Sequence, residues 1–315
     1  MNVLRDMSEL KTLRGPVAFA VGVFDGVHLG HQAVIQSAID FTEKHGGTTV
    51  VLTFDPHPLR VLRPDSAPLL LCSTAHKLHI LKQFGVDHVL VLPFTSETAK
   101  TDASAFIAAL VSSCQPLGFI SVGYTWSFGR GREGNVHQLM EMGQIHGFGV
   151  YGVPEVKIEE EVVSSTLIRE AVRTGNFQKA EHMLGRPYTV MGEVVKGRQL
   201  GRQLGFPTAN VAIENEELPP SGVYAVEAIL EGRKYPGVAN LGRRPTIEKD
   251  GEQILEVYLL DLDVDLYGAY LEVSFVKLLR QEQKFAGLEE LKSQIARDID
   301  TGRTVFSFRA SADAS

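Results

Sequence analysis

The spacing of apolar residues changes near residue 185, and this change constrains the fold more than any other feature of the chain. Up to residue 184, short apolar runs typical of buried strands alternate with stretches of helical spacing. The expected strands cover 16–21, 48–54, 86–92 and 119–122, and the expected helices cover 32–41, 75–84, 102–111 and 136–146. Such alternation is typical of a parallel sheet with helices on both faces, so we predict a Rossmann-like α/β domain over residues 1–184.

From Tyr188 onwards, strand-like segments follow one another, separated by turns rich in glycine, proline and acidic residues. These segments are 188–195, 223–230, 235–239, 254–260 and 270–279. A final helix is expected over 288–299, because its apolar residues recur at the spacing of one helix face. The pattern predicts a second domain over residues 185–315, an antiparallel β-barrel or sandwich with a terminal helix.

Length and charge narrow the class of protein further. A chain of 315 residues favours two domains, and a net charge of −7 without a basic block predicts no nucleic-acid partner. The first residues include acidic ones and lack an apolar core, so we expect no secretory signal peptide. We also expect no transmembrane helix, because no apolar run approaches the roughly 20 residues of a membrane span. Cys72 and Cys114 form no disulfide framework and are expected as buried thiols. We expect a cytoplasmic protein without membrane contact, as a monomer or weak homo-oligomer.

The segment Gly22–His31 places two histidines where the first strand turns into the first helix. A helix N-terminus offers free N–H groups and partial positive charge, and glycines allow a ligand close to the backbone. His28 and His31 can each donate a hydrogen bond to a phosphoryl oxygen. The segment therefore predicts a nucleotide triphosphate site. The alternatives are a pair of metal-binding histidines, for which cysteine or acidic partners are lacking nearby, and ordinary core histidines.

Three further segments of the first half have the composition of a ligand site. Asp55–Pro58 follows a strand directly, and its prolines fix the direction of His57, although a rigid surface turn would look the same. Gly123–Gly134 could hold an aromatic ring beside a phosphate, or it is a basic surface loop. Ser164–Arg169 begins a helix, where its hydroxyls and Arg169 suit either polyphosphate binding or simple capping.

The second half contains another phosphate-binding pattern. Gly192–Asn210 combines glycines with basic residues that can wrap a polyphosphate, although it lacks the ending of a Walker A loop. Thr208 and Asn210 alternate on one strand face and carry the oxygen ligands that Mg²⁺ prefers. Glu256, on the same face as apolar neighbours, could take a proton from an attacking hydroxyl. The alternatives are a mobile hairpin loop and an edge-strand glutamate that faces water.

Together these segments resemble the prokaryotic bifunctional riboflavin kinase/FMN adenylyltransferase family over nearly the whole chain. The first segment is similar to the HxGH signature of the nucleotidyltransferase superfamily, and Pro-Thr-Ala-Asn with a later strand glutamate is specific for the kinase module. The family markers occur in the order Gly22–His31, Thr53–Pro58, Gly123–Gly134, Ser164–Arg169, Gly205–Asn210, Gly237–Thr246, Asp265–Gly268 and Leu279–Phe285. The chain departs from the family at Thr125 and Trp126, which replace Asp or Asn followed by Phe, and at Tyr258, where His is common.

The resemblance implies that the second domain transfers the γ-phosphate of ATP to the 5′-hydroxyl of riboflavin and so forms FMN. Glu256 would be the general base, and Arg280 would lie near the flavin. Mg²⁺ would be held by Thr208 and Asn210. The residues implied to bind ATP are Lys196, Gly197, Gly205, Thr208 and Asn210.

For the first domain, the resemblance implies attack of the FMN phosphate on the α-phosphate of a second ATP, which gives FAD and pyrophosphate. His28, His31 and Arg169 would be the catalytic residues. The implied ATP-binding residues are Gly22, Phe24, Asp25, Gly30, Ser164 and Thr166. The implied flavin-binding residues are Asp55, Pro56, His57 and Trp126.

Three other functions stay open from the sequence. The chain could be a kinase whose first domain only regulates or binds flavin. It could be a nucleotidyltransferase for another acceptor, such as pantetheine phosphate or nicotinamide mononucleotide. It could also be a flavin-binding sensor without ATP turnover.

Overall fold

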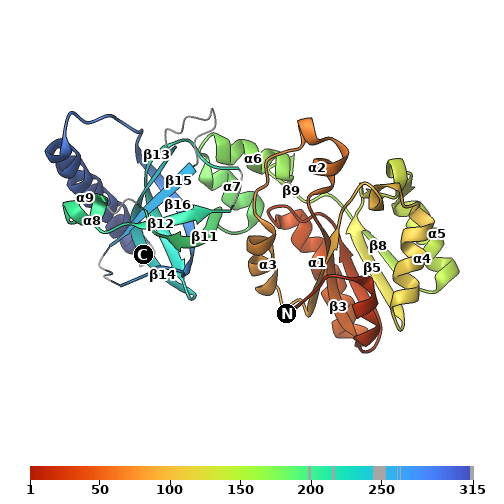
Figure 1. Cartoon of the computed structure of the whole chain (residues 1–315). Coiled ribbons are helices and arrows are strands. Elements are labelled where there is room, and N and C mark those ends of the chain that lie inside the picture. Colours follow the sequence, from red (N-terminus) through yellow and green to blue (C-terminus); the bar gives the residue numbers. More distant parts are fainter. Residues whose placement is uncertain (198–199, 215–216, 244–252, 261, 263, 313–315) are drawn as a thin grey trace. The chain divides into compact units, whose positions relative to one another are not determined.

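A computed structural model of the chain describes residues 1–197, 200–214, 217–243, 253–260, 262 and 264–312 (Figure 1). The chain divides into two compact units. The first unit comprises Met1–Ser165 with Met183–Gly185, and the second comprises Thr166–His182 with Arg186–Ser315. Most of helices α6 (Ser165–Arg173) and α7 (Phe177–Leu184) is therefore grouped with the second unit. The domain boundary after residue 184 stays a prediction.

The first unit is built on a six-stranded sheet in the order β1-β4-β3-β2-β5-β8, and every pair in it is parallel. Its strands are β1 (Asn2–Leu4), β2 (Val17–Val21), β3 (Thr48–Asp55), β4 (His88–Pro93), β5 (Leu117–Gly123) and β8 (Gly149–Val153). The chain runs outward from β2 through β3 to β4 and then crosses to β5 on the other side of β2. The strand order therefore reverses between β2 and β5, the position where such sheets bind ligands at the carboxyl ends of their strands.

Helices cover both faces of this sheet, as the alternating pattern predicts. They are α1 (Leu29–His45), α2 (Pro58–Leu62), α3 (Thr74–Lys82), α4 (Ala103–Ser113) and α5 (Val136–His146). Alternate residues of β2 enter two separate cores: Ala18 packs in the core with α1 and α3, and Phe19 packs in the core with α4 and α5. Figure 1 shows α4 and α5 beside β5 and β8.

Short elements complete the first unit. The hairpins are β6 (Ser127–Phe128) with β7 (Gly134–Asn135) and β9 (Lys157–Ile158) with β10 (Glu161–Val162). The 3₁₀ helices are η1 (Met7–Thr12), η2 (Pro64–Ser66), η3 (Thr98–Lys100) and η4 (Arg130–Arg132).

The second unit contains a closed antiparallel barrel in the order β11-β12-β15-β14-β13-β16, which confirms the predicted barrel. The strands are β11 (Thr189–Val195), β12 (Ala209–Ile213), β13 (Gly222–Leu230), β14 (Arg233–Arg243), β15 (Gln253–Leu259) and β16 (Tyr270–Arg280). Strand β16 pairs with both β11 and β13 and so closes the barrel.

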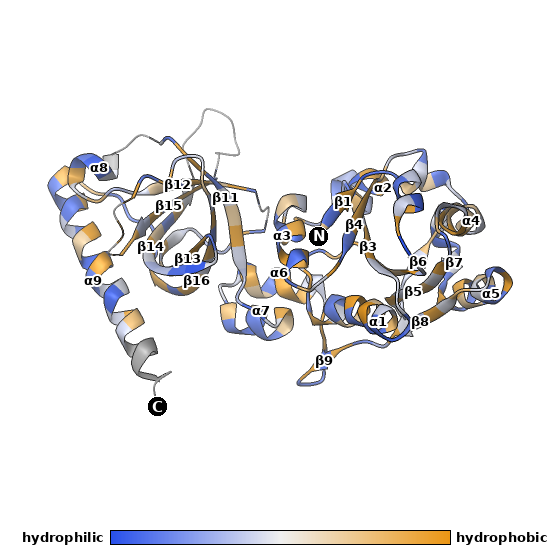
Figure 2. Cartoon of the chain, turned by 90° about the horizontal axis from the view of Figure 1, so that it is seen from below, coloured by the Kyte–Doolittle hydropathy of each residue, from blue (hydrophilic) through white to orange (hydrophobic). Residues whose placement is uncertain are grey.

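Two helices accompany the barrel strands. They are α8 (Leu200–Leu204) and α9 (Leu288–Ala312), and α9 continues well past the predicted end at residue 299. Apolar and polar stretches alternate along α9 (Figure 2), as expected for a helix that lies on a barrel surface. Among the residues that the structure describes, no helix combines the length and the apolar character of a membrane span.

Candidate functional site

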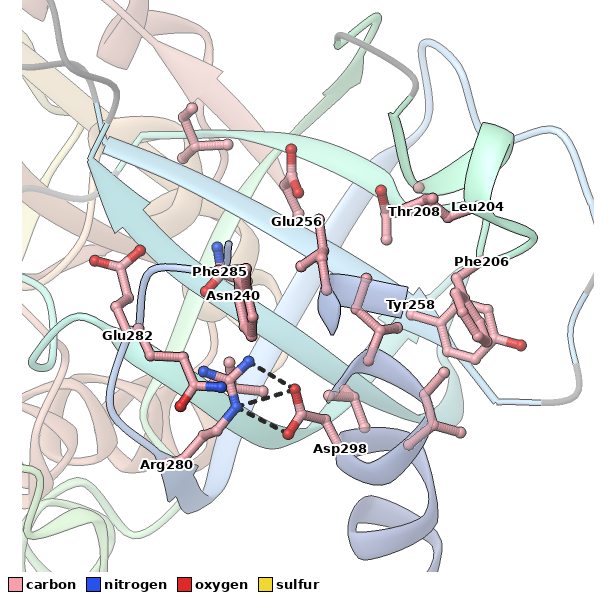
Figure 3. Close-up of a pocket in the computed structure, with 18 residues that line it drawn as sticks. Leu204, Phe206, Thr208, Asn240, Glu256, Tyr258, Arg280, Glu282, Phe285 and Asp298 are labelled. Carbon is pink, nitrogen blue, oxygen red and sulfur yellow. Dashed lines mark hydrogen bonds and ion pairs between the residues drawn. The ribbon is translucent and has the colours of Figure 1, made fainter. Parts of the chain in front are cut away.

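A cavity of about 360 Å³ lies between the barrel strands and helix α9 in the second unit. Its volume falls in the range of small-molecule sites, roughly 300–1,000 Å³. Figure 3 shows Glu256 and Thr208 close together and the rings of Phe206 and Tyr258 beside each other. These two rings meet edge to face, with centroids 6.1 Å apart. The polar residues of the lining are Thr208, Asn240, Glu256, Arg280, Glu282, Gln283 and Asp298.

Three polar residues form one row across neighbouring barrel strands. Asn210 of β12 pairs with Glu256 of β15, and Glu256 pairs with Asn240 of β14. Directly paired residues point to the same face of a sheet with their Cβ atoms about 5 Å apart. Glu256 and Asn240 also line the cavity. The carboxylate is therefore presented to the cavity from an interior strand of the barrel, with an amide on each side.

The side-chain oxygen of Asn210 can still accept a hydrogen bond or coordinate a metal ion. Its side chain is buried, and Asn210 Oδ1 accepts no hydrogen bond from the residues that the structure describes. A Cβ placed on Gly197 would collide with this amide, and a Cβ on Gly201 would lie 3.1 Å from Thr208 Oγ1. The two glycines therefore leave room for the Asn210 and Thr208 side chains and for backbone near them.

The donor set at Thr208 and Asn210 fits a magnesium ion. Hydroxyl and amide oxygens are hard donors, and Mg²⁺ keeps several waters and takes its remaining ligands from substrate phosphates. Within the described ranges no group of three or more His, Cys, Asp or Glu side chains comes together as a metal cage. The orphaned oxygen of Asn210 is the observation that fits the ion at this position.

Arg280 lines the cavity, and its guanidinium is held by helix α9. Nε donates to Asp298 Oδ1 at 2.9 Å and to Oδ2 at 3.1 Å, and Nη2 donates to Oδ2 at 2.8 Å (Figure 3). Nη1 donates to the carbonyl of Gln281, while Gln294 Nε2 donates to Asp298 Oδ1. Arg280 thus joins β16 to α9 beside the predicted flavin position.

The predicted phosphate loop of this unit is described only in part. Lys196 is exposed, with Nζ 5.8 Å from the centre of the Tyr267 ring. Gly205 has a φ of 90°, a left-handed backbone that favours glycine. Residues 198–199 of the loop lie outside the described residues, as do residues 244–246 of the Gly237–Thr246 marker.

In the first unit, the segment Gly22–His31 turns sharply after β2. Phe24 and Val27 have φ of 54° and 43°, and Gly26 has a φ of 78°. Positive φ is rare for a β-branched residue such as Val27, and such backbones cluster at ligand sites. The buried Phe24 ring packs over Gly22, where a Cβ would lie 3.1 Å from it. Gly30 and His31 fall in the first turn of α1, so their N–H groups point toward the loop.

His28 and His31 stack face to face, with ring centroids 3.6 Å apart. His28 caps α1: its Nδ1 accepts a hydrogen bond from the His31 backbone N–H at 3.3 Å. A neutral His28 ring then carries its proton on Nε2, the atom that can donate a hydrogen bond. Burial, the neighbouring His28 and the charge of Lys77 lower the pKa of His31 well below 6.5. His31 therefore offers a neutral imidazole at neutral pH.

Asp25 is buried, and its carboxylate holds two loops together. Asp25 Oδ1 accepts hydrogen bonds from the N–H groups of Leu71 at 2.9 Å and Cys72 at 3.4 Å. Ser165 Oγ donates to the Asp25 carbonyl at 3.0 Å, so the start of α6 reaches the Gly22–His31 loop. Ser164 precedes it in the first unit, while Thr166, which is exposed, and Arg169, which is buried, are grouped with the second.

The predicted flavin residues of the first unit lie at carboxyl ends of strands. Asp55 ends β3 and is exposed with Pro56, and His57 caps α2 by accepting the Leu59 N–H at 3.1 Å on Nδ1. Trp126 follows β5, is partly buried and stacks on Phe128 with centroids 4.5 Å apart. β3 and β5 are the strands on either side of β2.

Sequence reasoning gave no role to Asn240, Asp298 or Lys77. Asp298 lies seven residues after Leu291 and three after Ile295, so it falls on the apolar face of the predicted last helix. Lys77 lies three residues before Ile80, again on a buried helix face. A charged residue on an apolar face is the signal that could have found both.

Two family models match the chain in sequence. The model described as FAD synthetase matches residues 11–167, and the model described as riboflavin kinase matches residues 184–306. A bifunctional riboflavin kinase/FMN adenylyltransferase of Escherichia coli K12 is 42% identical over 287 residues, which is 91% of each chain. Its counterpart from Pseudomonas fluorescens is 37% identical over 97% of this chain and 98% of that one.

A solved structure has a similar fold over nearly the full length. It is the crystal structure of a Streptococcus pneumoniae chain described as a macrolide-efflux protein, with a TM-score of 0.80 and 30% identity. The similarity covers 96% of this chain and 98% of that one. The two family models and the full-length relatives agree with the two units described above. This chain belongs to the bifunctional riboflavin kinase/FMN adenylyltransferase family.

Proposed function

We propose that the chain makes FAD from riboflavin in two ATP-dependent steps, with the kinase site in the barrel unit and the adenylyltransferase site in the parallel-sheet unit. The observation that carries this proposal is the Asn210–Glu256–Asn240 row, which presents a carboxylate flanked by two amides to a cavity with aromatic residues in its lining. An aromatic wall suits a flat ring system, and a carboxylate between two amides suits a hydroxyl that must lose a proton.

In the first step, Glu256 accepts the proton of the riboflavin 5′-hydroxyl while that oxygen attacks the γ-phosphorus of ATP. The bond from this phosphorus to the β-phosphate oxygen breaks, and ADP leaves. The Thr208 hydroxyl and Asn210 Oδ1 would hold Mg²⁺ and the phosphates of ATP, and the ion would supply positive charge to the transferring group. Lys196, Gly197 and Gly205 form the loop around the phosphate tail. Arg280, fixed by Asp298, borders the flavin.

In the second step, a phosphate oxygen of FMN attacks the α-phosphorus of a second ATP, and pyrophosphate leaves. His28 and His31 donate hydrogen bonds to the oxygens on which charge develops, and the N-terminus of α1 adds its N–H groups. Ser164 holds the leaving pyrophosphate, a role that the family resemblance extends to Thr166 and Arg169. Gly22, Phe24, Asp25 and Gly30 shape the ATP pocket.

The flavin of the second step lies at the carboxyl ends of β3 and β5. Asp55, Pro56 and His57 border it after β3, and the Trp126 ring offers an apolar surface after β5. Neither step requires a covalent enzyme intermediate, so catalysis consists of positioning and electrostatic stabilisation.

We further propose a cytoplasmic enzyme that acts as a monomer or weak homo-oligomer, without a nucleic-acid or membrane partner. Cys72 and Cys114 are both free and buried, which suits a reducing compartment. The match of the second half to the riboflavin kinase model favours flavin over other acceptors of the adenylyl group.

Chromatography of a reaction that contains riboflavin, ATP, Mg²⁺ and the purified chain tests the proposal. FMN that appears first and is then converted to FAD is the expected result. FMN alone would leave only the kinase and would favour a regulatory first unit. Flavin binding without either product would favour a sensor and refute the proposed function.

A further inference from the structure

Lys77 is a buried cation that neither proposed step uses. It lies in α3 of the first unit and is only 5% exposed. Its Nζ donates to the Val23 carbonyl at 2.8 Å and lies 3.4 Å from Thr53 Oγ1. Both acceptors are neutral, and Lys77 forms no ion pair with a carboxylate in the part of the chain that the structure describes. Lysines are almost never this buried unless their charge is compensated.

The position of this ammonium connects it to the Gly22–His31 loop. Val23 lies in that loop two residues after the end of β2, and Thr53 lies near the end of the neighbouring β3. Thr53 Oγ1 also donates a hydrogen bond to the Val23 carbonyl, at 2.9 Å. This one carbonyl therefore accepts hydrogen bonds from both Lys77 and Thr53. The charge therefore lies beneath the carboxyl edge of the sheet, where α/β sheets bind ligands.

The charge of Lys77 also reaches His31. It is one of the causes that lower the pKa of His31, together with burial and the stacked His28. A neutral His31 imidazole gives a hydrogen-bond donor but no net positive charge. The N-terminus of α1 supplies only about half an elementary charge. Lys77 is thus a full positive charge close to the proposed phosphate site.

A purely structural role explains less of this arrangement. A lysine that only anchored Val23 would lose hydration of its ammonium in exchange for two neutral acceptors, which is unfavourable. A methionine could fill the same volume without that loss. A positive charge at this place becomes favourable when an anion binds at the loop above it.

We propose that Lys77 is a positioning residue for adenylyl transfer. Its ammonium holds the Val23 carbonyl, and thereby the Gly22–His31 loop, in place. Its positive charge offsets the negative charge of the phosphates of bound ATP. This inference rests on the proposed function of the first unit. Its ligand is the triphosphate of a nucleoside triphosphate. No bond to Lys77 forms or breaks in the reaction.

The test compares two substitutions in the full chain with Mg²⁺ present. Lys77→Gln keeps a hydrogen-bond donor and removes the charge, whereas Lys77→Arg keeps the charge. Lys82→Met, an exposed lysine on the same helix, is the matched control. FMN formation by the barrel unit serves as an internal control for intact protein, and fluorescence of Trp126 during unfolding reports the first unit. The rates of FAD formation from FMN are then measured over a range of ATP concentrations.

We expect Lys77→Gln to lower kcat/KM for ATP in FAD formation on the order of 100-fold, the loss typical of one preorganised electrostatic group. FMN formation should stay unchanged, and Lys77→Arg should recover at least a tenth of the wild-type FAD rate. Lys82→Met should behave as wild type.

Full FAD formation by a folded Lys77→Gln variant would overturn the proposal. So would equal losses in Lys77→Gln and Lys77→Arg when both unfold like the wild type, since charge would then be irrelevant. If Lys77→Gln does not fold, Lys77→Met decides by the same criteria. A wild-type chain that forms FMN but no FAD would instead refute the proposed function of the first unit.

Discussion

The Arg280–Asp298 pair should hold helix α9 against the barrel and thereby shape the flavin cavity. The two side chains are 21% and 8% exposed, so solvent screens them little. Three hydrogen bonds of 2.8–3.1 Å join them, and Gln294 adds a fourth to Asp298 at 2.9 Å. Leu291, Ile295 and Ile299 of the same helix line the cavity. We predict that breaking the pair weakens both the barrel unit and its binding of riboflavin.

The magnitude follows from the burial and geometry of the pair. Removing one partner of a buried ion pair costs about 3–5 kcal/mol because the other charge stays buried without compensation. This pair reaches the cavity surface, so we expect about 2–4 kcal/mol for Arg280→Met and for Asp298→Asn separately. The double variant contains no uncompensated charge. It should lose no more than the worse single variant, which corresponds to a coupling of at least about 2 kcal/mol.

The assay is a double-mutant cycle in denaturant, followed by far-UV circular dichroism. Trp126, the single tryptophan, lies in the first unit, so its fluorescence serves as an internal control that should not shift. Riboflavin KM should rise roughly tenfold in each single variant, equivalent to about 1.4 kcal/mol of lost binding. FAD formation from supplied FMN should be unaffected. Losses that add within about 0.5 kcal/mol in the double variant would refute the reasoning.

Three further predictions follow from other contacts. Gly197→Ala should push the Asn210 amide aside, because the added Cβ would collide with it. Since such overpacking costs about 1–3 kcal/mol, kcat/KM for FMN formation should fall by about ten- to a hundredfold. Unchanged kinetics would contradict this prediction. The folded chain binds a proton at His31 less readily than the unfolded chain, so the first unit should lose stability as the pH falls below 6.5. Unfolding followed by Trp126 fluorescence at several pH values should show a smaller loss of stability in His31→Asn. Burial raises the pKa of Cys114 to about 12, so a thiol reagent at pH 8 should label it only after unfolding; rapid labelling of the folded chain would count against its burial.

The class of each unit could be predicted from the sequence because strong periodicity marks the long elements. The alternating strands and helices gave the parallel sheet, and the succession of short strands gave the barrel. Strands β1 and β8 of the sheet were not predicted, and neither were the two-residue strands β6, β7, β9 and β10. At β12, the sequence indicated only that Thr208 and Asn210 share a strand face. β1 has three residues and β8 contains two glycines, so neither has the apolar alternation of a strand.

The site depends on pairings between distant segments, which local patterns do not contain. Asn210 and Glu256 could each be proposed from local motifs, but their common row with Asn240 depends on the register of three barrel strands. Arg280 could be placed near the flavin by resemblance, whereas its partner Asp298 lies on a helix 18 residues later. The Lys77 contact with Val23 joins residues 54 positions apart.

The most direct test of the central claim uses Glu256→Gln to separate the two proposed activities in one chain. With riboflavin and ATP, this variant should form FMN about 100- to 10,000-fold more slowly than the wild type, the usual contribution of a general base. With FMN and ATP, it should form FAD at the wild-type rate, because Glu256 belongs to the barrel unit. FMN formation at the wild-type rate, or loss of FAD formation from supplied FMN in a folded variant, would contradict the assignment of one reaction to each unit.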